Sequence, residues 1–191
     1  MSVVSVVPVG SMLLDAVVAR RSYSKVTTDA PTHDELLPLV AAAATAADHC
    51  ALRPWRLIEL RGDARKRLGD ALIAASGHTA EPAARLADKP LRAELLIAIV
   101  ASRRESSKVD VWEQDAAAAG IAHLLSLLLT DAGWGVMWRT GAHTRSMPVR
   151  TLHNLADTEN LLGWLYVGGV PAGSKPRVRL PIDPVDHLTV L

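Results

Sequence analysis

The stretch Glu94-Leu95-Leu96-Ile97-Ala98-Ile99-Val100 decides the fold of this chain. After its first residue every side chain is apolar, whereas a strand with one face in water would alternate apolar and polar residues. The stretch therefore predicts an interior strand, in a sheet that helices cover on both faces. By contrast, Trp55-Arg56-Leu57-Ile58-Glu59-Leu60 alternates bulky and polar residues, which predicts a strand with one wet face.

The longest predicted helix covers residues 112–131. Residues 121–129, in its middle, are hydrophobic nearly all round, and complete burial is the expected reason for such a pattern. We expect this helix to be the axis of the fold or the seam of a dimer. His123 lies within the apolar run, so we expect a core histidine with satisfied hydrogen bonds and assign it no role.

Shorter elements complete the predicted architecture. Ser11 can cap a helix that ends near Arg20, and Thr32 with Glu35 three residues later forms a capping box for a helix over residues 33–46. The remaining predicted elements are helices at 64–75 and after Glu81-Pro82, a turn into a strand at 133–139, and a strand at 161–167. The sequence shows no repeat or interdomain linker. It therefore predicts one α+β domain over residues 1–191, with an N-terminal arm at 1–10 and an extended C-terminal tail at 171–191.

The composition is that of a compact globular protein, with 49% hydrophobic and 21% charged residues in a chain of 191. A net charge of +1 with mixed signs gives no basic face for nucleic acid or for an acidic membrane, so we expect neither partner. The uncharged stretch at residues 116–130, which no other uncharged stretch exceeds in length, is shorter than the roughly 20 residues of a membrane span. Cys50 is the only cysteine, which excludes an internal disulfide and a multi-thiolate metal site and fits a reducing cytoplasm.

The motifs of the commonest enzyme classes are absent. Gly133-x-Gly135 has the form of the start of a dinucleotide-binding fingerprint, but Trp138 stands at the sixth position and a strand is predicted to follow where a helix is required. The sequence has no phosphate-binding loop ending in Gly-Lys-Ser/Thr, no HExxH zinc motif and no nucleophile elbow. We therefore predict no metal site and no nucleophilic side chain.

Arg20-Arg21-Ser22, directly after the first predicted helix, allows two interpretations. Arginine forks bind phosphate oxygens bidentately and stay charged at any ordinary pH, so the triplet can hold the phosphate of a nucleotide-like cofactor. Cations at a helix C-terminus also interact favourably with the helix dipole and cap free carbonyls, so the same residues can serve the helix alone. The local sequence leaves both interpretations open.

Two further places concentrate unusual side chains. Asp48-His49 follows the second predicted helix and is either part of a site or an ordinary polar turn. Trp138-Arg139-Thr140-Gly141 lies at the end of a predicted strand and is either part of a site or ordinary sheet packing with a solvated arginine. Neither segment identifies a function alone.

Taken in order, these segments resemble the nitroreductase family of flavin enzymes, most closely its compact branch of small bacterial NAD(P)H nitroreductases. The resemblance spans nearly the whole chain. It starts with a helix that ends in Arg-Arg-Ser and is carried further by these segments: Pro31-Thr32, Ala46-Ala47-Asp48-His49 with Pro54-Trp55, Trp112-Glu113-Gln114, Trp138-Arg139-Thr140-Gly141 and Leu165-Tyr166-Val167-Gly168.

The resemblance implies an α+β fold, with a central, mainly antiparallel sheet flanked by helices and a long buried central helix. It also implies a homodimer with flavin mononucleotide (FMN) sites between the subunits. By position, Arg20, Arg21 and Ser22 would hold the phosphate and ribityl chain. Arg177 and Arg179 in the C-terminal tail have the form of a basic pair that reaches the same phosphate in larger family members.

Other residues are implied to meet the flavin itself. Trp138, Arg139 and Thr140 would line it, and His49 would approach it from the other subunit. The resemblance implies a cytoplasmic oxidoreductase with a ping-pong mechanism, in which NADH or NADPH reduces FMN and a nitroaromatic, quinone or similar flat acceptor is then reduced. No catalytic side chain is expected, because the cofactor performs the chemistry.

Three positions depart from the family pattern. Ser24 stands where many members have a basic residue, with Lys25 beside it, and Ala47 and Arg53 replace a proline and a glutamine. These departures keep two alternatives open: an FMN-binding protein without turnover, and another flavin reaction of the superfamily such as reductive dehalogenation or flavin fragmentation. The proton that a reduced acceptor takes up could come from His49 or from solvent.

Overall fold

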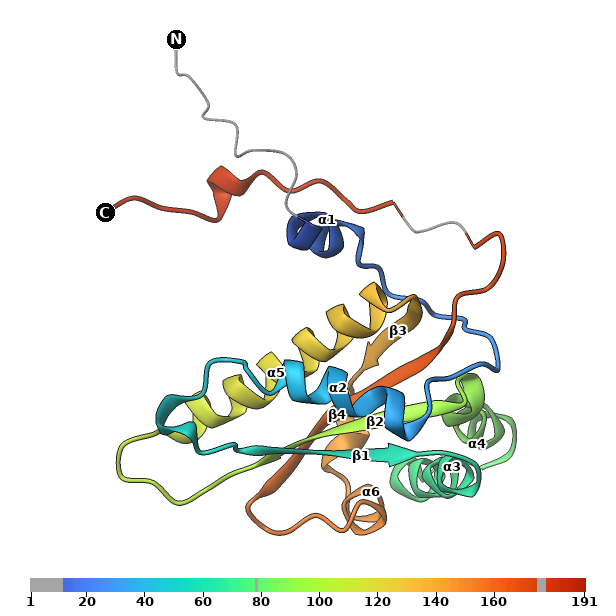
Figure 1. Cartoon of the computed structure of the whole chain (residues 1–191). Helices are drawn as coiled ribbons and strands as arrows, with labels where there is room; N and C mark the ends of the chain where they lie inside the picture. Colours follow the sequence, from blue (N-terminus) through green and yellow to red (C-terminus); the bar gives the residue numbers. More distant parts are fainter. Residues whose placement is uncertain (1–11, 78, 175–177) are drawn as a thin grey trace.

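A computed structural model describes residues 12–77, 79–174 and 178–191 of the chain (Figure 1). The helices are α1 (Met12–Ala19), α2 (His33–Ala43), α3 (Asp63–Ser76), α4 (Ala80–Ala87), α5 (Val111–Asp131) and α6 (Met147–Leu152). The strands are β1 (Trp55–Leu60), β2 (Leu95–Ser102), β3 (Trp134–Arg139) and β4 (Glu159–Gly169). The N-terminal arm expected at residues 1–10 lies outside the described residues.

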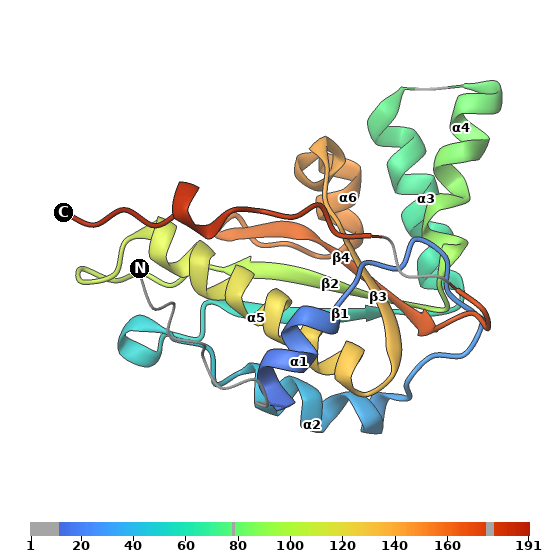
Figure 2. The ribbon, with the colours of Figure 1, turned by 90° about the horizontal axis from the view of Figure 1, so that it is seen from above.

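The strands form one antiparallel sheet in the order β1-β2-β4-β3. β2 lies inside this sheet, where Ile97 is opposite Glu59 of β1 and Leu165 of β4. Figure 2 shows α2 and α5 on one face of the sheet and α3, α4 and α6 on the other. The predicted interior strand, covered by helices on both faces, is confirmed.

Alternate side chains of β2 enter two separate hydrophobic cores, because successive strand residues point to opposite faces. One core joins α2 and α5 to the side chains of Leu95, Ile97 and Ile99. The other joins α3, α4 and α6 to those of Leu96, Ala98 and Val100. This double burial explains why the strand has no polar residue in its interior.

The central helix α5 is buried on one side only in the single chain. Ile121, Leu125 and Leu129 are at most 1% exposed, whereas Leu124 and Leu128 are only partly buried. The prediction that residues 121–129 are buried all round therefore does not hold within one chain. Helical residues turn by about 100° each, so a helix that is apolar all round can still present one apolar side outward.

The prediction of a buried His123 is wrong. This residue lies on the outward side of α5 and is exposed. Its ring packs edge-on against Trp138, with 5.1 Å between the ring centroids and an angle of 81° between the planes. The surrounding leucines suggested burial because the sequence alone did not show which side of the helix faces the sheet.

The segment after α1 runs along the free edge of β3 and then past the end of β4. Tyr23 N donates to Val136 O at 3.0 Å, and Thr27 N donates to Gly169 O at 2.8 Å. Glycine is required for this approach, because a Cβ on Gly168 would stand 2.7 Å from Cγ2 of Val26. Since the segment runs antiparallel to β3, it brings Arg20-Arg21-Ser22 toward the end of the strand that carries Trp138.

An ion pair between partly exposed Arg56 and buried Glu159 fixes the start of β4. Arg56 Nε and Nη2 donate to the two carboxylate oxygens of Glu159, each at 2.7 Å, and Ala156 N also donates to Glu159 Oε2. Arg56 is the main cause that lowers the pKa of Glu159 from 4.5 to about 2. The carboxylate therefore contributes stability above pH 4.5, and this contribution is lost as the pH falls toward 2.

Replacing Glu159 by glutamine is expected to remove this pH dependence. Of the fall in the wild-type free energy of unfolding between pH 5 and pH 2, about 1.5 kcal/mol should come from Glu159, because solvent near the partly exposed Arg56 screens part of the interaction. Urea unfolding at several pH values between 2 and 5 measures the free energy of unfolding. In the variant the slope should be smaller by that amount, and an unchanged slope would contradict the assignment to Glu159.

Helix α6 has no counterpart among the predicted elements. It is six residues long and begins Met147-Pro148, and so short a segment carries too few turns for a periodic pattern. Within the described ranges, none of the helices combines the length and hydrophobicity that crossing a membrane requires.

Candidate functional site

Three arginines meet where α1 ends. Arg20 O accepts a hydrogen bond from Arg179 Nη2 at 2.8 Å and another from Arg21 Nη1 at 2.9 Å, although Arg179 is 159 residues away in the sequence. Burial, followed by the charges of Arg179 and Arg21, lowers the pKa of Arg20. In the described part of the chain, none of these guanidinium groups forms an ion pair with a carboxylate. The cluster is therefore positively charged and not neutralised.

Arg21 serves the helix and also keeps a free donor. Its Nη1 donates to Val18 O in the last turn of α1, as the capping interpretation predicts, while its Nε is buried without a hydrogen-bond partner among the described residues. Ser22 is exposed, with its Oγ 3.5 Å from Nη1 of Arg20. The predicted phosphate ligand Arg177 lies outside the described residues.

Trp138, Arg139 and Thr140 line one cavity of about 330 Å³. The guanidinium of Arg139 lies over the ring of Tyr166, with its Cζ 5.1 Å from the ring centroid. Arg139 Nε and Trp138 Nε1 are buried and, among the described residues, have no hydrogen-bond partner. Buried N–H groups are rarely left unpaired in proteins, so Arg139 Nε is a donor for a ligand in this cavity. The indole of Trp138 lies on the face of the sheet that α5 covers, against His123.

A second cationic cavity adjoins Arg139. Lys25, Arg92 and Arg139 line about 550 Å³ together with Ser24 and Val26. Burial raises the pKa of Tyr166 to about 12, and the charges of Arg139 and Arg92 oppose this rise, which places both cations near the phenol. From the sequence, Lys25 was noted only as a neighbour of Ser24, and Arg92 was not predicted as a site residue. Nothing in the sequence links the segment before β2, which carries Arg92, to the end of β3.

His49 lies apart from the arginine cluster, in a short 3₁₀ helix (His49–Ala51) beside the N-terminal half of α5. Its Nδ1 is 2.9 Å from Oε2 of Glu113, and both residues line a cavity of about 680 Å³ that Trp112 also borders. No contact in the described residues joins His49 to Arg20 or Trp138 within the same chain. Glu113 is a second residue that sequence reasoning missed, although it lies in the Trp112-Glu113-Gln114 motif.

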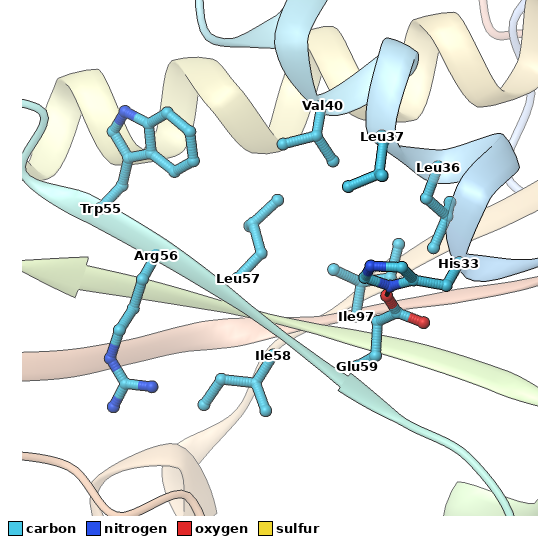
Figure 3. Close-up of a pocket in the computed structure, with 10 residues that line it drawn as sticks. All are labelled: His33, Leu36, Leu37, Val40, Trp55, Arg56, Leu57, Ile58, Glu59 and Ile97. Atoms are coloured by element: carbon cyan, nitrogen blue, oxygen red, sulfur yellow. Dashed lines mark hydrogen bonds and ion pairs between the residues drawn. The ribbon is translucent and has the colours of Figure 1, made fainter.

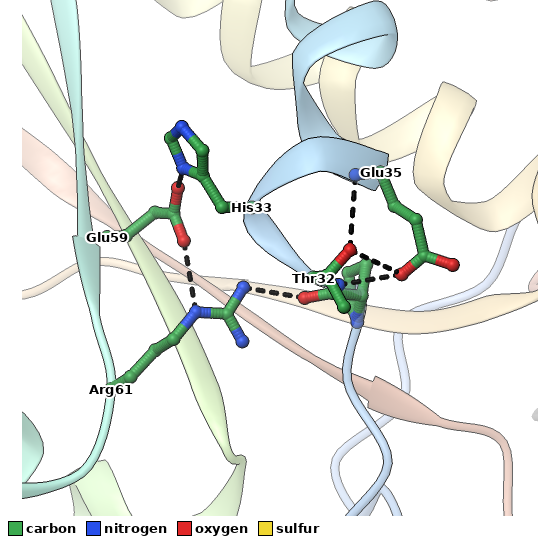
Figure 4. A network of polar contacts seen from close by, with 6 residues as sticks. Thr32, His33, Glu35, Glu59 and Arg61 are labelled. Carbon is green, nitrogen blue, oxygen red and sulfur yellow. Dashed lines mark hydrogen bonds and ion pairs between the residues drawn. The ribbon is translucent and has the colours of Figure 1, made fainter.

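Another cavity, of about 690 Å³, separates α2 from the edge strand β1 (Figure 3). Its lining is mainly apolar, and its polar side chains already have partners. His33 Nδ1 contacts Glu59 Oε1, while Arg61 donates from Nε to Glu59 Oε2 and from Nη2 to Pro31 O. Figure 4 shows these contacts beside the Thr32–Glu35 capping box. This network fastens the start of α2 to β1 and offers no free cation.

Among the described residues, no group of three or more His, Cys, Asp or Glu side chains could hold a metal ion. The donors that the structure gathers are instead arginines and a lysine. Such a set suits a ligand with an anionic group and a polar ring edge.

A model of the Nitroreductase family matches residues 17–169. Among curated proteins, the chain is 30% identical over 179 residues to "Putative NAD(P)H nitroreductase YdjA" of Escherichia coli K12, which covers 92% of this chain and 97% of that protein.

Solved structures share the fold. A nitroreductase-like family protein from Bacillus cereus superposes with a TM-score of 0.80 at 22% identity, covering 97% of this chain and 98% of that one. A variant of the FMN- and NADPH-dependent nitroreductase NfnB from Sphigopyxis sp. strain HMH superposes with a TM-score of 0.75 at 18% identity, covering 95% of this chain and 99% of that one. Iodotyrosine deiodinase bound to FMN and 3-iodo-L-tyrosine superposes with a TM-score of 0.67 at 17% identity, covering 90% of this chain and 97% of that one.

Proposed function

Because the chain belongs to the nitroreductase family, a family of oxidoreductases, we propose that it is an FMN-dependent enzyme in which NADH or NADPH reduces the flavin. A nitroaromatic, quinone or similar flat acceptor then enters and is reduced, in a ping-pong sequence. The observation that carries this proposal is the arginine cluster of Arg20, Arg21 and Arg179, which has the charge for a phosphate and, in the described residues, no carboxylate to neutralise it.

The cluster fits the phosphate of FMN for an electrostatic reason. The C-terminus of α1 carries the negative end of the helix dipole and repels an anion. A single cation would be partly offset by this field, whereas three guanidinium groups outweigh it and supply forked donors to the phosphate oxygens. Ser22, exposed beside Arg20, would donate to the phosphate or to the ribityl chain.

The cations around Arg139 fit the ring of FMN. Bound FMN would accept the hydride from NAD(P)H and pass electrons to the acceptor. Reduction places negative charge on the pyrimidine edge of the ring, where positive donors are favourable. Lys25, Arg92 and Arg139 would meet that edge, and Lys25 would thereby supply the charge that Ser24 lacks. Arg139 Nε would gain the partner that it lacks among the described residues.

A homodimer is part of the proposal. Large apolar side chains are exposed on α1 and along the C-terminal tail, among them Met12 (89%), Val178 (94%) and Leu180 (85%). A soluble monomer rarely exposes so much contiguous apolar surface, so a second copy is the expected cover. A shared site would also explain why His49 lies apart from Arg20 in one chain. The free, exposed Cys50 suits the reducing cytoplasm that we propose as the location.

Sedimentation at micromolar concentration is expected to show a particle of twice the 20.4-kDa chain mass. The dimer should persist in high salt, because apolar burial is not screened by ions. A monomer at every concentration would remove sites shared between subunits from the proposal.

The function is tested by an absorption spectrum of the protein reconstituted with FMN, recorded anaerobically before and after addition of NADH or NADPH. We expect a bound-flavin spectrum that bleaches with the nicotinamide and recovers when a quinone is added. Binding without bleaching would favour the alternative of an FMN-binding protein without turnover. The departures from the family pattern at Ser24, Ala47 and Arg53 are the reason for keeping this alternative. Absence of any bound flavin would refute both.

A further inference from the structure

The His49–Glu113 pair is held by more than its own contact. Glu113 Oε1 accepts from Asp110 N at 3.1 Å as the third residue of a capping box at the start of α5, while Oε2 faces His49 Nδ1 at 2.9 Å. The carboxylate is therefore fixed by the helix before it meets the imidazole. Its contact with His49, followed by the bond from Asp110, lowers the pKa of Glu113, so it is an anion at neutral pH.

An anionic acceptor at Nδ1 determines how the imidazole is presented. A neutral histidine carries its proton on one ring nitrogen only, and the partner of the other nitrogen decides which. With Glu113 at Nδ1, the proton stays there and Nε2 is left for the cavity. Asp48, the other carboxylate lining this cavity, already accepts from Arg53 N at 2.7 Å.

The cavity around His49 has room for a flat ring. Trp112, with 69% of its surface exposed, borders one side. Small residues form the rest of the lining: Ala46, Ala47, Ala116, Ala117 and Gly120. A Cβ on Gly120 would make only ordinary contact with Ala46, at 3.7 Å, so the lining is not tightly packed at this point.

We propose that Glu113 is a positioning residue that fixes the tautomer of His49, and that His49 gives the proton which a quinone acceptor takes up on reduction. This rests on the proposed function and on its dimer, which would bring His49 to the FMN of the partner subunit. Reduction of a quinone to a hydroquinone needs two electrons and two protons, and the hydride of NAD(P)H supplies both electrons and one proton. Imidazolium His49 gives the second proton from Nε2 to the quinone oxygen and regains it from solvent.

Glu113→Gln tests the proposal, because glutamine keeps the capping box but removes the charge. In the FMN-loaded protein, ¹⁵N NMR should show the Nδ1-protonated form of His49 in the wild type and a mixture of tautomers in the variant, with His49→Gln identifying the signals. In stopped-flow measurements, reoxidation by a quinone should slow about tenfold in the variant. Flavin reduction by NADH should stay within twofold.

Glu35→Gln is the matched control, since Glu35 is also the third residue of a capping box, on α2, and contacts Thr32 but no histidine. It should change neither the His49 signals nor either half-reaction. A Glu113→Gln variant with unchanged quinone reoxidation would overturn the proposal, whether or not its tautomer shifts. If NADH reduces no flavin even in the wild type, the proposed function itself has failed, and this is recognisable before the variant is compared.

Discussion

Replacing Arg20 by alanine is expected to weaken FMN binding by about 1.5–3 kcal/mol, or roughly 10- to 150-fold in Kd, the usual worth of a hydrogen bond to a charged group. The free protein should become no less stable, because Arg20 adds its charge to those of Arg21 and Arg179. Titration of FMN fluorescence at fixed ionic strength measures the affinity, and thermal unfolding without FMN measures the stability.

The pair of measurements separates the two interpretations of the triplet. If Arg20 only caps α1, the variant should lose stability and keep its affinity for FMN, the reverse of what we expect. Arg67→Ala provides the control, since Arg67 is an exposed arginine on α3 outside the cluster. It removes the same charge from the molecule as a whole, so a comparable loss of affinity there would assign the effect to net charge.

Replacing Gly163 by alanine is expected to destabilise the fold by about 3 kcal/mol. Gly163 of β4 has φ of +139°, and an added Cβ would stand 2.3 Å from the carbonyl oxygen of Arg139 and 2.8 Å from Trp138 Nε1. Strands β3 and β4 would have to separate at the residues that line the proposed flavin site. Folded variant protein should therefore also bind FMN less tightly.

Gly133→Ala separates backbone strain from collision. Gly133 also has a positive φ, of +88°, but a Cβ there would meet no atom within 4 Å. This variant should lose only about 1 kcal/mol, the conformational cost alone. Urea unfolding followed by tryptophan fluorescence compares the two. Equal losses in both variants would mean that the close approach of β3 and β4 at Gly163 carries no cost of its own.

The sequence predicted the elements whose pattern is local. β1 has the bounds expected from its alternation, and the apolar run of β2 correctly placed that strand inside the sheet. α2 begins at the predicted residue because Thr32 and Glu35 form the capping box that their spacing suggested. It ends at Ala43, three residues before the prediction, since a run of alanines gives no signal for a C-terminus.

The candidate site was less predictable because its residues meet across long stretches of sequence. Arg20 and Arg139 were marked by motifs, but the partnership of Lys25 and Arg92 with Arg139 depends on how the segment along β3 passes the end of that strand. The contact of His49 with Glu113 spans 64 residues. A hydrogen bond at that separation leaves no periodicity to detect, whereas helix caps and strand alternation do.

The contact between Arg179 and the carbonyl of Arg20 also bears on the order in which the protein folds. The two residues are 159 positions apart, so the arginine cluster proposed to hold the phosphate forms only after distant segments of the chain have met. Contacts of such long sequence separation also close late in folding, because the entropy of loop closure opposes them. During refolding the sheet should therefore form before the proposed site can hold FMN tightly, and uptake of the cofactor should mark a fully folded molecule.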